Sequence, residues 1–93
     1  MMSPRVRLSR RAVKDLDRLA SPDARRVVAA LGRLVLPMPR DLDVVPIVGH
    51  PPWLRLRVGD FRVLFRPERA TSTFLVVRVI NRRDLERAVE GLG

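Results

Sequence analysis

The opening residues change from a strand-like to a helix-like spacing of apolar side chains. Residues 5–8 alternate charged and apolar positions, which is typical of a short strand. Ser9 then offers a helix N-cap. After Ser9, apolar residues recur every three or four positions, as in an amphipathic helix of about three turns: they are Ala12, Val13, Leu16, Leu19 and Ala20.

A second helix is predicted directly after the first. Ser21 is suited to cap it, Pro22 to occupy its first position and Asp23 to complement the helix dipole. Pro37 and Pro39 end the pattern, because proline cannot continue a helix. The apolar positions in between form one continuous stripe: Ala24, Val27, Val28, Leu31, Leu34 and Val35. The two helices are therefore expected to form a hairpin with a shared buried face.

The second half of the chain has the two-residue period of β-strands. Residues 37–53 hold five of the eight prolines and are expected to form a loop that leads back to the sheet. Gly59 and Asp60 lie between two alternating runs and predict a tight hairpin turn. Three consecutive strands are predicted: residues 54–58, 61–66 and 73–80.

The chain is expected to end in a short helix. Asn81 and Asp84 resemble a capping box, and Leu85, Ala88 and Val89 would supply the apolar side of one or two helical turns. The expected fold class is α+β, in the order β-α-α-β-β-β-α. An N-terminal strand and a two-helix hairpin would pack on an antiparallel sheet.

The two-residue turn determines which side chains of the hairpin share a face. Pairing of Val58 with Phe61 places Arg57 opposite Arg62. Six apolar residues are then expected to face the helices: Leu54, Leu56, Val58, Phe61, Val63 and Phe65. The opposite, open face is expected to carry Arg55, Arg57, Arg62, Leu64 and Arg66, with Arg78 from the last strand.

Charge makes this arginine-bearing face a candidate site. The formal net charge is +9, and Lys14 is the only lysine among nineteen basic residues. Such a surplus attracts polyanions, and guanidinium groups bind phosphate through two parallel hydrogen bonds. Like charges directly opposite on a sheet, as at Arg57 and Arg62, are destabilising by under about 1 kcal/mol unless an anion lies between them. Surface arginines also commonly extend into water or pair with carboxylates such as Asp60 and Glu68, and the sequence leaves both alternatives open.

Other kinds of site have little support in the sequence. The absence of cysteine excludes disulfides and thiol chemistry. No histidine cluster, acidic pair or glycine-rich phosphate loop is present, so neither a metal nor a cofactor is expected. His50, Trp53 and Glu86 are single residues of types that more often serve structure or solvation than catalysis or base stacking.

Length and the N-terminal segment predict one soluble domain over residues 1–93. The segment MMSPRVRLSRR is basic but lacks the apolar stretch of a secretory signal. No apolar run approaches the roughly 20 residues that span a bilayer. A cytoplasmic protein without a membrane partner is expected.

Two segments resemble motifs of a known toxin superfamily. LRLRVGDFRVLFR, residues 54–66, and VINRRDLERAV, residues 79–89, resemble motifs of the RelE/ParE superfamily of toxins from bacterial type II toxin-antitoxin systems. The preceding segment RLSRRAVKDLDRLASPDARRVVAAL is similar to the strand and two helices of that family. The resemblance covers nearly the whole chain and favours the RelE-like branch.

In the RelE-like branch, the resemblance implies a ribosome-dependent mRNA endoribonuclease that inhibits translation. Cleavage would be metal-independent, by attack of a ribose 2′-hydroxyl on the adjacent phosphate. The implied partners are mRNA on the ribosome and a cognate antitoxin, in a toxin-antitoxin hetero-oligomer. The positions that match the family's catalytic residues are Arg55, Arg62 and Arg82, and those expected to bind RNA are Arg57, Arg83, Arg66 and Arg78.

The sequence also departs from the family pattern. It has no tyrosine, its hairpin has no lysine, and Leu85 or Glu86 stands where many relatives carry a tyrosine. Arginine remains protonated at neutral pH and is a poor base, so the proton transfer that cleavage needs has no obvious acceptor. The alternatives are a ParE-like toxin that inhibits gyrase without cleaving nucleic acid, and a catalytically decayed RNA-binding member.

Overall fold

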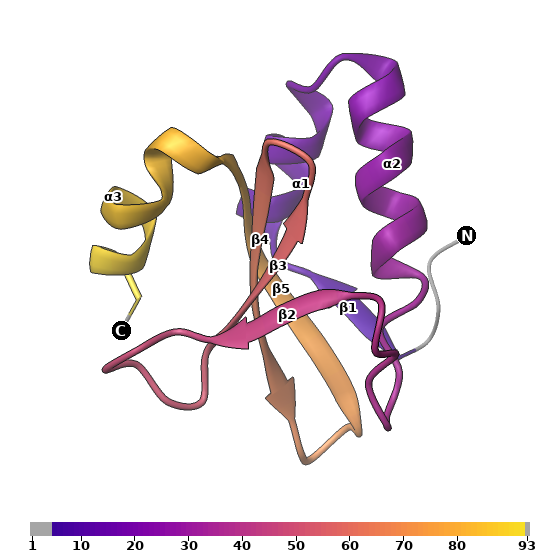
Figure 1. Ribbon diagram of the computed structural model, residues 1–93, viewed down its shortest axis with the longest axis vertical. Coiled ribbons are helices and arrows are strands. Elements are labelled where there is room, and N and C mark those ends of the chain that lie inside the picture. Colours follow the sequence, from indigo (N-terminus) through magenta and orange to yellow (C-terminus); the bar gives the residue numbers. More distant parts are fainter. Residues whose placement is uncertain (1–4, 93) are drawn as a thin grey trace.

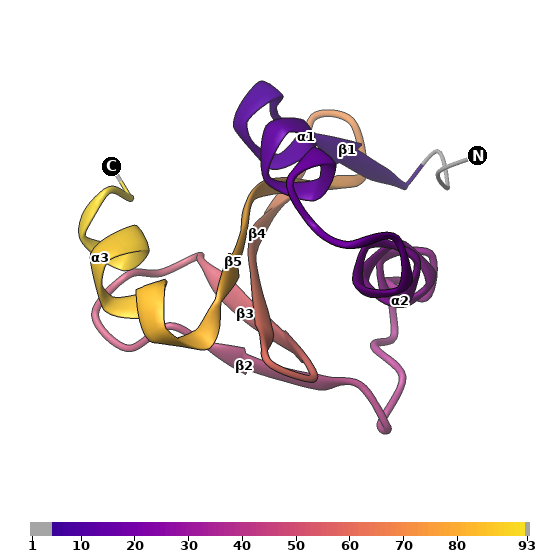
Figure 2. The same ribbon diagram turned by 90° about the horizontal axis from the view of Figure 1, so that it is seen from above.

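The computed structural model describes residues 5–92 as a five-stranded mixed sheet with helices on both faces (Figures 1 and 2). The other residues of the expected domain, 1–4 and 93, lie outside this description. The elements, in chain order, are β1 (Val6–Leu8), α1 (Arg10–Asp17), α2 (Ser21–Leu31), β2 (Asp43–Pro46), β3 (Leu54–Val58), β4 (Phe61–Glu68), β5 (Thr73–Asn81), the 3-10 turn η1 (Arg82–Asp84) and α3 (Leu85–Glu90).

The strands are arranged in the order β1-β5-β4-β3-β2. The α+β class is confirmed, but the sheet is not wholly antiparallel. β1 pairs with β5 in parallel, with Val6 opposite Phe74, whereas the other neighbours are antiparallel. Helices α1 and α2 cover one face, and α3 lies over the other (Figure 2). None of the helices among residues 5–92 is long and apolar enough to cross a membrane.

The first helix begins where the sequence predicts and ends earlier. Ser9 is its N-cap, because the Ser9 hydroxyl accepts a hydrogen bond from the Ala12 amide at 3.1 Å. The same hydroxyl donates to the Val77 carbonyl at 3.0 Å and so fixes the helix start to β5. The helix ends at Asp17, which makes it about a turn shorter than expected.

The second helix has a different cap from the one that the sequence predicts. Ser21 is the first helical residue rather than the cap, and Ala20 at the N-cap position makes no side-chain hydrogen bond. The helix ends at Leu31 with Gly32 as its C-cap, before the prolines are reached. Leu34 lies beyond the helix yet is fully buried, whereas Val28, expected in the buried stripe, is 40% exposed.

The main core lies between the sheet and helices α1 and α2. The hairpin register agrees with the prediction, with Val58 opposite Phe61 and Arg57 opposite Arg62. Of the six hairpin residues expected to face the helices, three are fully buried in this core and the other three are partly buried and pack against it. The rings of Phe65 and Phe74 meet edge to face at 5.5 Å.

Part of the region expected to be a loop is a strand. β2 runs antiparallel to β3 at the edge of the sheet, with Asp43 opposite Arg57 and Pro46 opposite Leu54. Pro46 is compatible with this position because an edge strand leaves one row of amide groups unpaired. Because the prolines predicted a loop, the sequence did not reveal this strand, which lies beside the arginine-bearing hairpin.

The face opposite α1 and α2 is only partly open. α3 packs on it and builds a second core from Leu64, Ile80 and Ala88. The pairing of β4 with β5 shifts by one residue between Leu64 and Phe65. This irregularity changes which side chains of β5 point to each face of the sheet. As a result Val76 and Val79, three positions apart, both belong to the main core.

The hairpin turn depends on the conformation of one glycine. Gly59 has a φ of 57°, in the left-handed region, and it is the only turn residue of the two with positive φ. Alanine at this position is expected to lower the free energy of unfolding by about 1–2 kcal/mol, because a Cβ atom is unfavourable at this φ. Chemical denaturation of Gly59→Ala would measure the loss.

The matched control is Gly32→Ala. Gly32 has a φ of −64°, and its added Cβ would lie 3.5 Å from the Ala29 carbonyl oxygen, an ordinary contact. The free energy of unfolding of the Gly32→Ala variant should be unchanged or higher by up to about 1 kcal/mol. Equal effects of the two substitutions would contradict a specific requirement for positive φ at the turn.

Candidate functional site: an arginine cluster beside the hairpin turn

The Gly59–Asp60 turn holds Arg62 close to the sheet. Arg62 follows the turn directly, and its Nη1 donates hydrogen bonds to the carbonyl oxygens of Gly59 and Phe61, each at 3.0 Å. The residue is only 9% exposed. The turn backbone therefore fixes a nearly buried positive charge on the face opposite α1 and α2.

Three other arginines surround this charge. Burial lowers the pKa of Arg62 from its usual value, and the neighbouring charges of Arg57, Arg55 and Arg82 lower it further. Asp43 acts in the opposite direction and raises that pKa. We call Arg55, Arg57, Arg62 and Arg82 the arginine cluster. The nearby carboxylates of Asp43 and Asp60 do not balance four positive charges, so the cluster retains a net positive charge that favours a bound anion.

The four members differ in how firmly they are held. The Arg55 side chain is 19% exposed and donates through Nη2 to Asp43 Oδ1 at 2.9 Å, while its Nε is buried and has no partner within residues 5–92. Arg82 is 66% exposed, with its Nε 3.9 Å from Asp60 Oδ1. Arg57 is exposed, and within the described residues its guanidinium makes no hydrogen bond or ion pair. Arg57 and Arg82 are thus the members most available to a ligand.

The structure brings the three arginines matched to catalytic positions into one cluster with Arg57. The remaining predicted RNA-binding residues lie elsewhere. Arg83 is exposed and donates through Nε to Asn81 Oδ1 at 3.2 Å. The guanidinium of Arg66 lies over the Trp53 ring, 5.5 Å from its centroid, toward the other end of the hairpin.

Arg78 is held by a carboxylate that the sequence analysis did not single out. Asp15 of α1 is nearly buried and accepts from Arg78 Nε and from the Val79 amide, both at 2.9 Å. Its other oxygen lies 3.4 Å from Arg78 Nη2. Asp15 thus ties α1 to β5, and much of the hydrogen-bonding capacity of Arg78 is used inside the protein.

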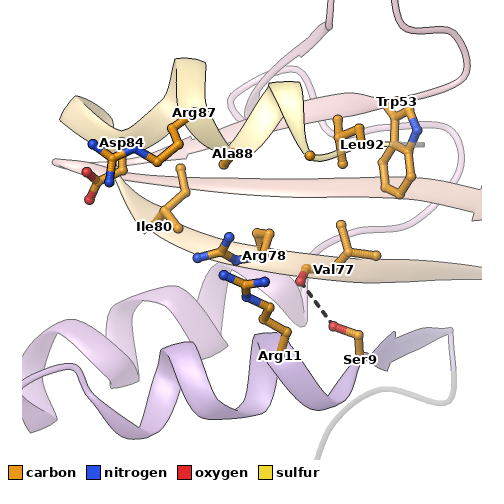
Figure 3. A pocket seen from close by; sticks show the side chains of 11 residues that line it. Ser9, Arg11, Trp53, Val77, Arg78, Ile80, Asp84, Arg87, Ala88 and Leu92 are labelled. Carbon is orange, nitrogen blue, oxygen red and sulfur yellow. Dashed lines mark hydrogen bonds between the residues drawn. The ribbon is translucent and has the colours of Figure 1, made fainter.

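A groove separates α1 from α3 along β5 (Figure 3). Its volume is about 590 Å³, within the range of small-molecule sites. Arg11 and Arg78 line it on the side of α1 and β5, and Arg87 on the side of α3. Trp53 and Leu92 lie at one end (Figure 3). The groove therefore combines basic side chains with an aromatic ring.

The remaining single candidates are not part of the cluster. His50 lies in the turn before β3, where its amide donates to the Ile47 carbonyl at 3.1 Å. Glu86 is exposed on α3. Asn81 caps η1 by accepting from the Arg83 amide at 3.1 Å, whereas Asp84 makes no capping hydrogen bond, so the predicted capping box is only half present.

Asp43 is the residue of the site that sequence reasoning missed. It lies opposite Arg57 on β2 and binds Arg55, in a segment expected to be loop. The alternation of Asp41, Leu42, Asp43 and Val44, followed by the β-branched Val45, is the signal that could have revealed the strand. No group of three or more potential metal-ligating residues occurs within residues 5–92.

A match to a family of known toxins agrees with this fold. The family model described as "ParE toxin of type II toxin-antitoxin system, parDE" matches residues 6–86. The chain belongs to this family. The predicted membership of the RelE/ParE superfamily is thereby confirmed, and this ParE-family chain is a toxin of the type II toxin-antitoxin class. A search of curated protein sequences gave no significant match.

Two solved toxin-antitoxin structures have the same fold as this ParE-family chain. The RelB-RelE antitoxin-toxin complex from Methanococcus jannaschii matches with a TM-score of 0.71 and 20% identity, over 87% of this chain and 95% of that one. The archaeal RelE-RelB complex from Pyrococcus horikoshii OT3 matches with a TM-score of 0.69 and 27% identity, over 84% of this chain and 93% of that one. The RelE-like fold that the sequence predicts is thus confirmed.

The Asp15 contact generates a test of stability. Asp15→Ala removes the carboxylate that binds Arg78 and the Val79 amide, and leaves both partners without their hydrogen bonds. The expected loss in the free energy of unfolding is about 3–5 kcal/mol, because the carboxylate is nearly buried. The control Asp17→Ala changes an exposed carboxylate in the same helix and should alter stability by less than about 0.5 kcal/mol. A small loss for Asp15→Ala, measured by urea denaturation, would show that water replaces its contacts.

Proposed function

We propose that this toxin is a ribosome-dependent mRNA endoribonuclease that inhibits translation in the cytoplasm. The observation that carries the proposal is the arginine cluster, in which Arg55, Arg57 and Arg62 of the hairpin gather on one sheet face with Arg82 of η1 nearby. The two solved RelE chains with the same fold add support for this branch.

The cluster has the properties needed to stabilise phosphoryl transfer. Attack of a ribose 2′-hydroxyl on the adjacent phosphate concentrates negative charge on the phosphate oxygens. Donors already fixed in place stabilise such charge, and one donor is typically worth about 3 kcal/mol. Arg62 is fixed by the turn carbonyls, and Arg55 by Asp43. Neither group needs extensive reorganisation when the charge develops.

The more exposed arginines are suited to hold the RNA chain. Arg57 and Arg82 flank Arg62 and have the most accessible guanidinium groups of the cluster. Guanidinium groups bind phosphate oxygens through paired donors, which fixes the position of the backbone relative to the reacting atoms. We assign contact with the scissile phosphate to Arg57 and Arg82, and electrostatic stabilisation to Arg62.

The groove between α1 and α3 offers a second set of contacts for single-stranded RNA. Arg11 and Arg87 supply positive charge along it, Arg78 adds the part of its guanidinium that Asp15 does not bind, and Trp53 supplies a ring on which a base can stack. Arg66 lies over that ring, which itself lines the groove. RNA would thus extend beyond the arginine cluster.

An antitoxin is the second proposed partner. Both structurally similar toxins were solved in complex with RelB antitoxins. For this chain, we expect a cognate antitoxin to cover the basic surface with an acidic or amphipathic segment, since complementary charge favours such a complex. The proposed assembly is a toxin-antitoxin hetero-oligomer.

A second candidate function is inhibition of gyrase without cleavage of nucleic acid. The ParE family model and the absence of tyrosine from the chain favour it. The two functions have different consequences in cells. A gyrase inhibitor would leave mRNA intact and induce a DNA-damage response.

The arginine cluster predicts the effect of single substitutions on mRNA cleavage. Arg57→Ala or Arg82→Ala should slow cleavage about 100-fold or more, because each removes a guanidinium group from the phosphate site. Primer extension on mRNA from cells expressing each variant would map and quantify the cuts. Arg25→Ala is the matched control, since Arg25 is exposed on α2 and its loss changes the net charge equally. Intact mRNA with an induced DNA-damage response in wild-type cells would instead select the gyrase inhibitor.

Trp53 allows RNA binding in the groove to be observed directly. It is the only tryptophan, so its fluorescence reports on the groove alone. A single-stranded oligoribonucleotide should quench this fluorescence, and Arg87→Ala should weaken the binding without preventing the quench at saturation. Arg25→Ala again serves as the control, because Arg25 does not line the groove. Cleavage without any change in fluorescence would show that RNA bypasses Trp53.

A further inference from the structure

Asp43 is a carboxylate placed within the arginine cluster. It lies directly opposite Arg57 across the β2–β3 ladder, so the two side chains leave the sheet on the same face. Val44, the next residue, packs against the main core on the other face. The backbone of β2 therefore directs Asp43 toward the site.

The interactions of Asp43 with neighbouring arginines agree with this orientation of its side chain. Asp43 Oδ1 accepts from Arg55 Nη2 at 2.9 Å, and its negative charge acts on the buried Arg62. The side chain of Asp43 is 47% exposed. Only one of its oxygens has a hydrogen-bond partner within residues 5–92, so Oδ2 remains available to a ligand.

Asp60 is the other carboxylate near the cluster, and its position differs. Asp60 lies in the hairpin turn, where its side chain is 72% exposed, and its one ion pair within residues 5–92 is with Arg82, at 3.9 Å. It is thus at the end of the hairpin, whereas Asp43 lies beside Arg55 and Arg57 on the sheet face. Asp43 is thus the carboxylate that lies on the sheet face opposite Arg57, one of the two arginines assigned to the scissile phosphate.

The chemistry of cleavage requires such a group. The attacking 2′-hydroxyl must lose a proton, and a guanidinium group, being already protonated, cannot accept it. The chain has no tyrosine, and its one lysine, Lys14, belongs to α1 on the other side of the sheet. An ionised carboxylate within the phosphate-binding cluster can accept the proton.

We propose that Asp43 is the general base of the cleavage reaction, an inference that rests on the endoribonuclease function proposed above. Asp43 takes the proton of the 2′-hydroxyl as its oxygen forms a bond to phosphorus. The bond between phosphorus and the 5′-oxygen breaks, and that oxygen takes a proton from solvent water. The products are a 2′,3′-cyclic phosphate and a 5′-hydroxyl, and Asp43 returns its proton to water.

The contact with Arg55 has a definite role in this reaction. It orients the Asp43 carboxylate and leaves Oδ2 free to face the ribose. Arg55, Arg57 and Arg62 together outweigh the single negative charge of Asp43, so the site still attracts phosphate. The same arrangement thus supplies both the proton acceptor and the stabilising charge.

The test compares cleavage and binding for Asp43→Asn on purified ribosomes programmed with an mRNA. Asparagine keeps the size of the side chain but cannot accept the proton. The single-turnover cleavage rate should fall about 100-fold or more, whereas the affinity for programmed ribosomes should be unchanged or higher, because a negative charge is lost. Asp43→Glu should restore part of the rate, since it restores a carboxylate. Asp41→Asn is the control and should cleave within about twofold of wild type, because Asp41 pairs with Arg33 outside the site.

Each other outcome has a separate meaning. Cleavage by Asp43→Asn within about threefold of wild type would overturn the role of Asp43 and leave the endoribonuclease function intact. Weaker ribosome binding in proportion to the lost cleavage would also overturn it, since Asp43 would then only hold Arg55 in place. Loss of cleavage in Asp60→Asn but not in Asp43→Asn would assign the base to the turn. No cleavage by the wild-type protein would reject the proposed function itself.

Discussion

The pairing of Val58 with Phe61 across the two-residue turn is the constraint on which the rest of the site depends. A shift of one residue in this register would exchange the two faces of the hairpin, so the arginines would be buried against the helices and the apolar residues exposed. Burial of Leu56, Val63 and Phe65 prevents that shift, because all three are completely enclosed in the main core. The positions of the charged groups are therefore determined by hydrophobic packing on the other side of the same strands. Arg62 further stabilises the turn by donating hydrogen bonds to the carbonyl oxygens of Gly59 and Phe61.

Two kinds of arginine result from this arrangement. Some are held by internal partners: Arg78 joins β5 to α1 through Asp15, and Arg62 binds the carbonyl oxygens of Gly59 and Phe61. Others, such as Arg57, have a guanidinium group without a partner among the residues that the structure describes. The difference follows from the environment of each residue, since a side chain that is surrounded by protein needs internal partners, whereas one at the surface can exchange water for phosphate. Arginine abundance in the sequence does not distinguish the two kinds, but their neighbours in the fold do.

The sequence predicted the parts of the fold that local rules control. The hairpin register followed from a two-residue turn, and the cap at Ser9 from the chemistry of helix N-termini. The errors arose where distant segments decide the outcome. Residues 43–46 form a strand because they pair with the edge of β3, although Pro46 and the prolines on either side of the segment favour a loop. The ion pair between Asp15 and Arg78 joins residues 63 positions apart and has no local signature. The arginine cluster was therefore predictable as a set of residues, while the carboxylate within it required the sheet topology.

Both edges of the sheet are short. β1 has three residues, and β2 has four and ends in Pro46, which has no amide hydrogen to offer a neighbour. A bound segment cannot gain much by adding itself as another strand, since few backbone groups are available on either side. Surface side chains of this toxin therefore offer a partner more contacts than the described sheet edges do. Specificity among closely related toxin-antitoxin pairs in one cell would be set by surface residues that can change without disturbing the fold, so new pairings can evolve while the scaffold stays the same.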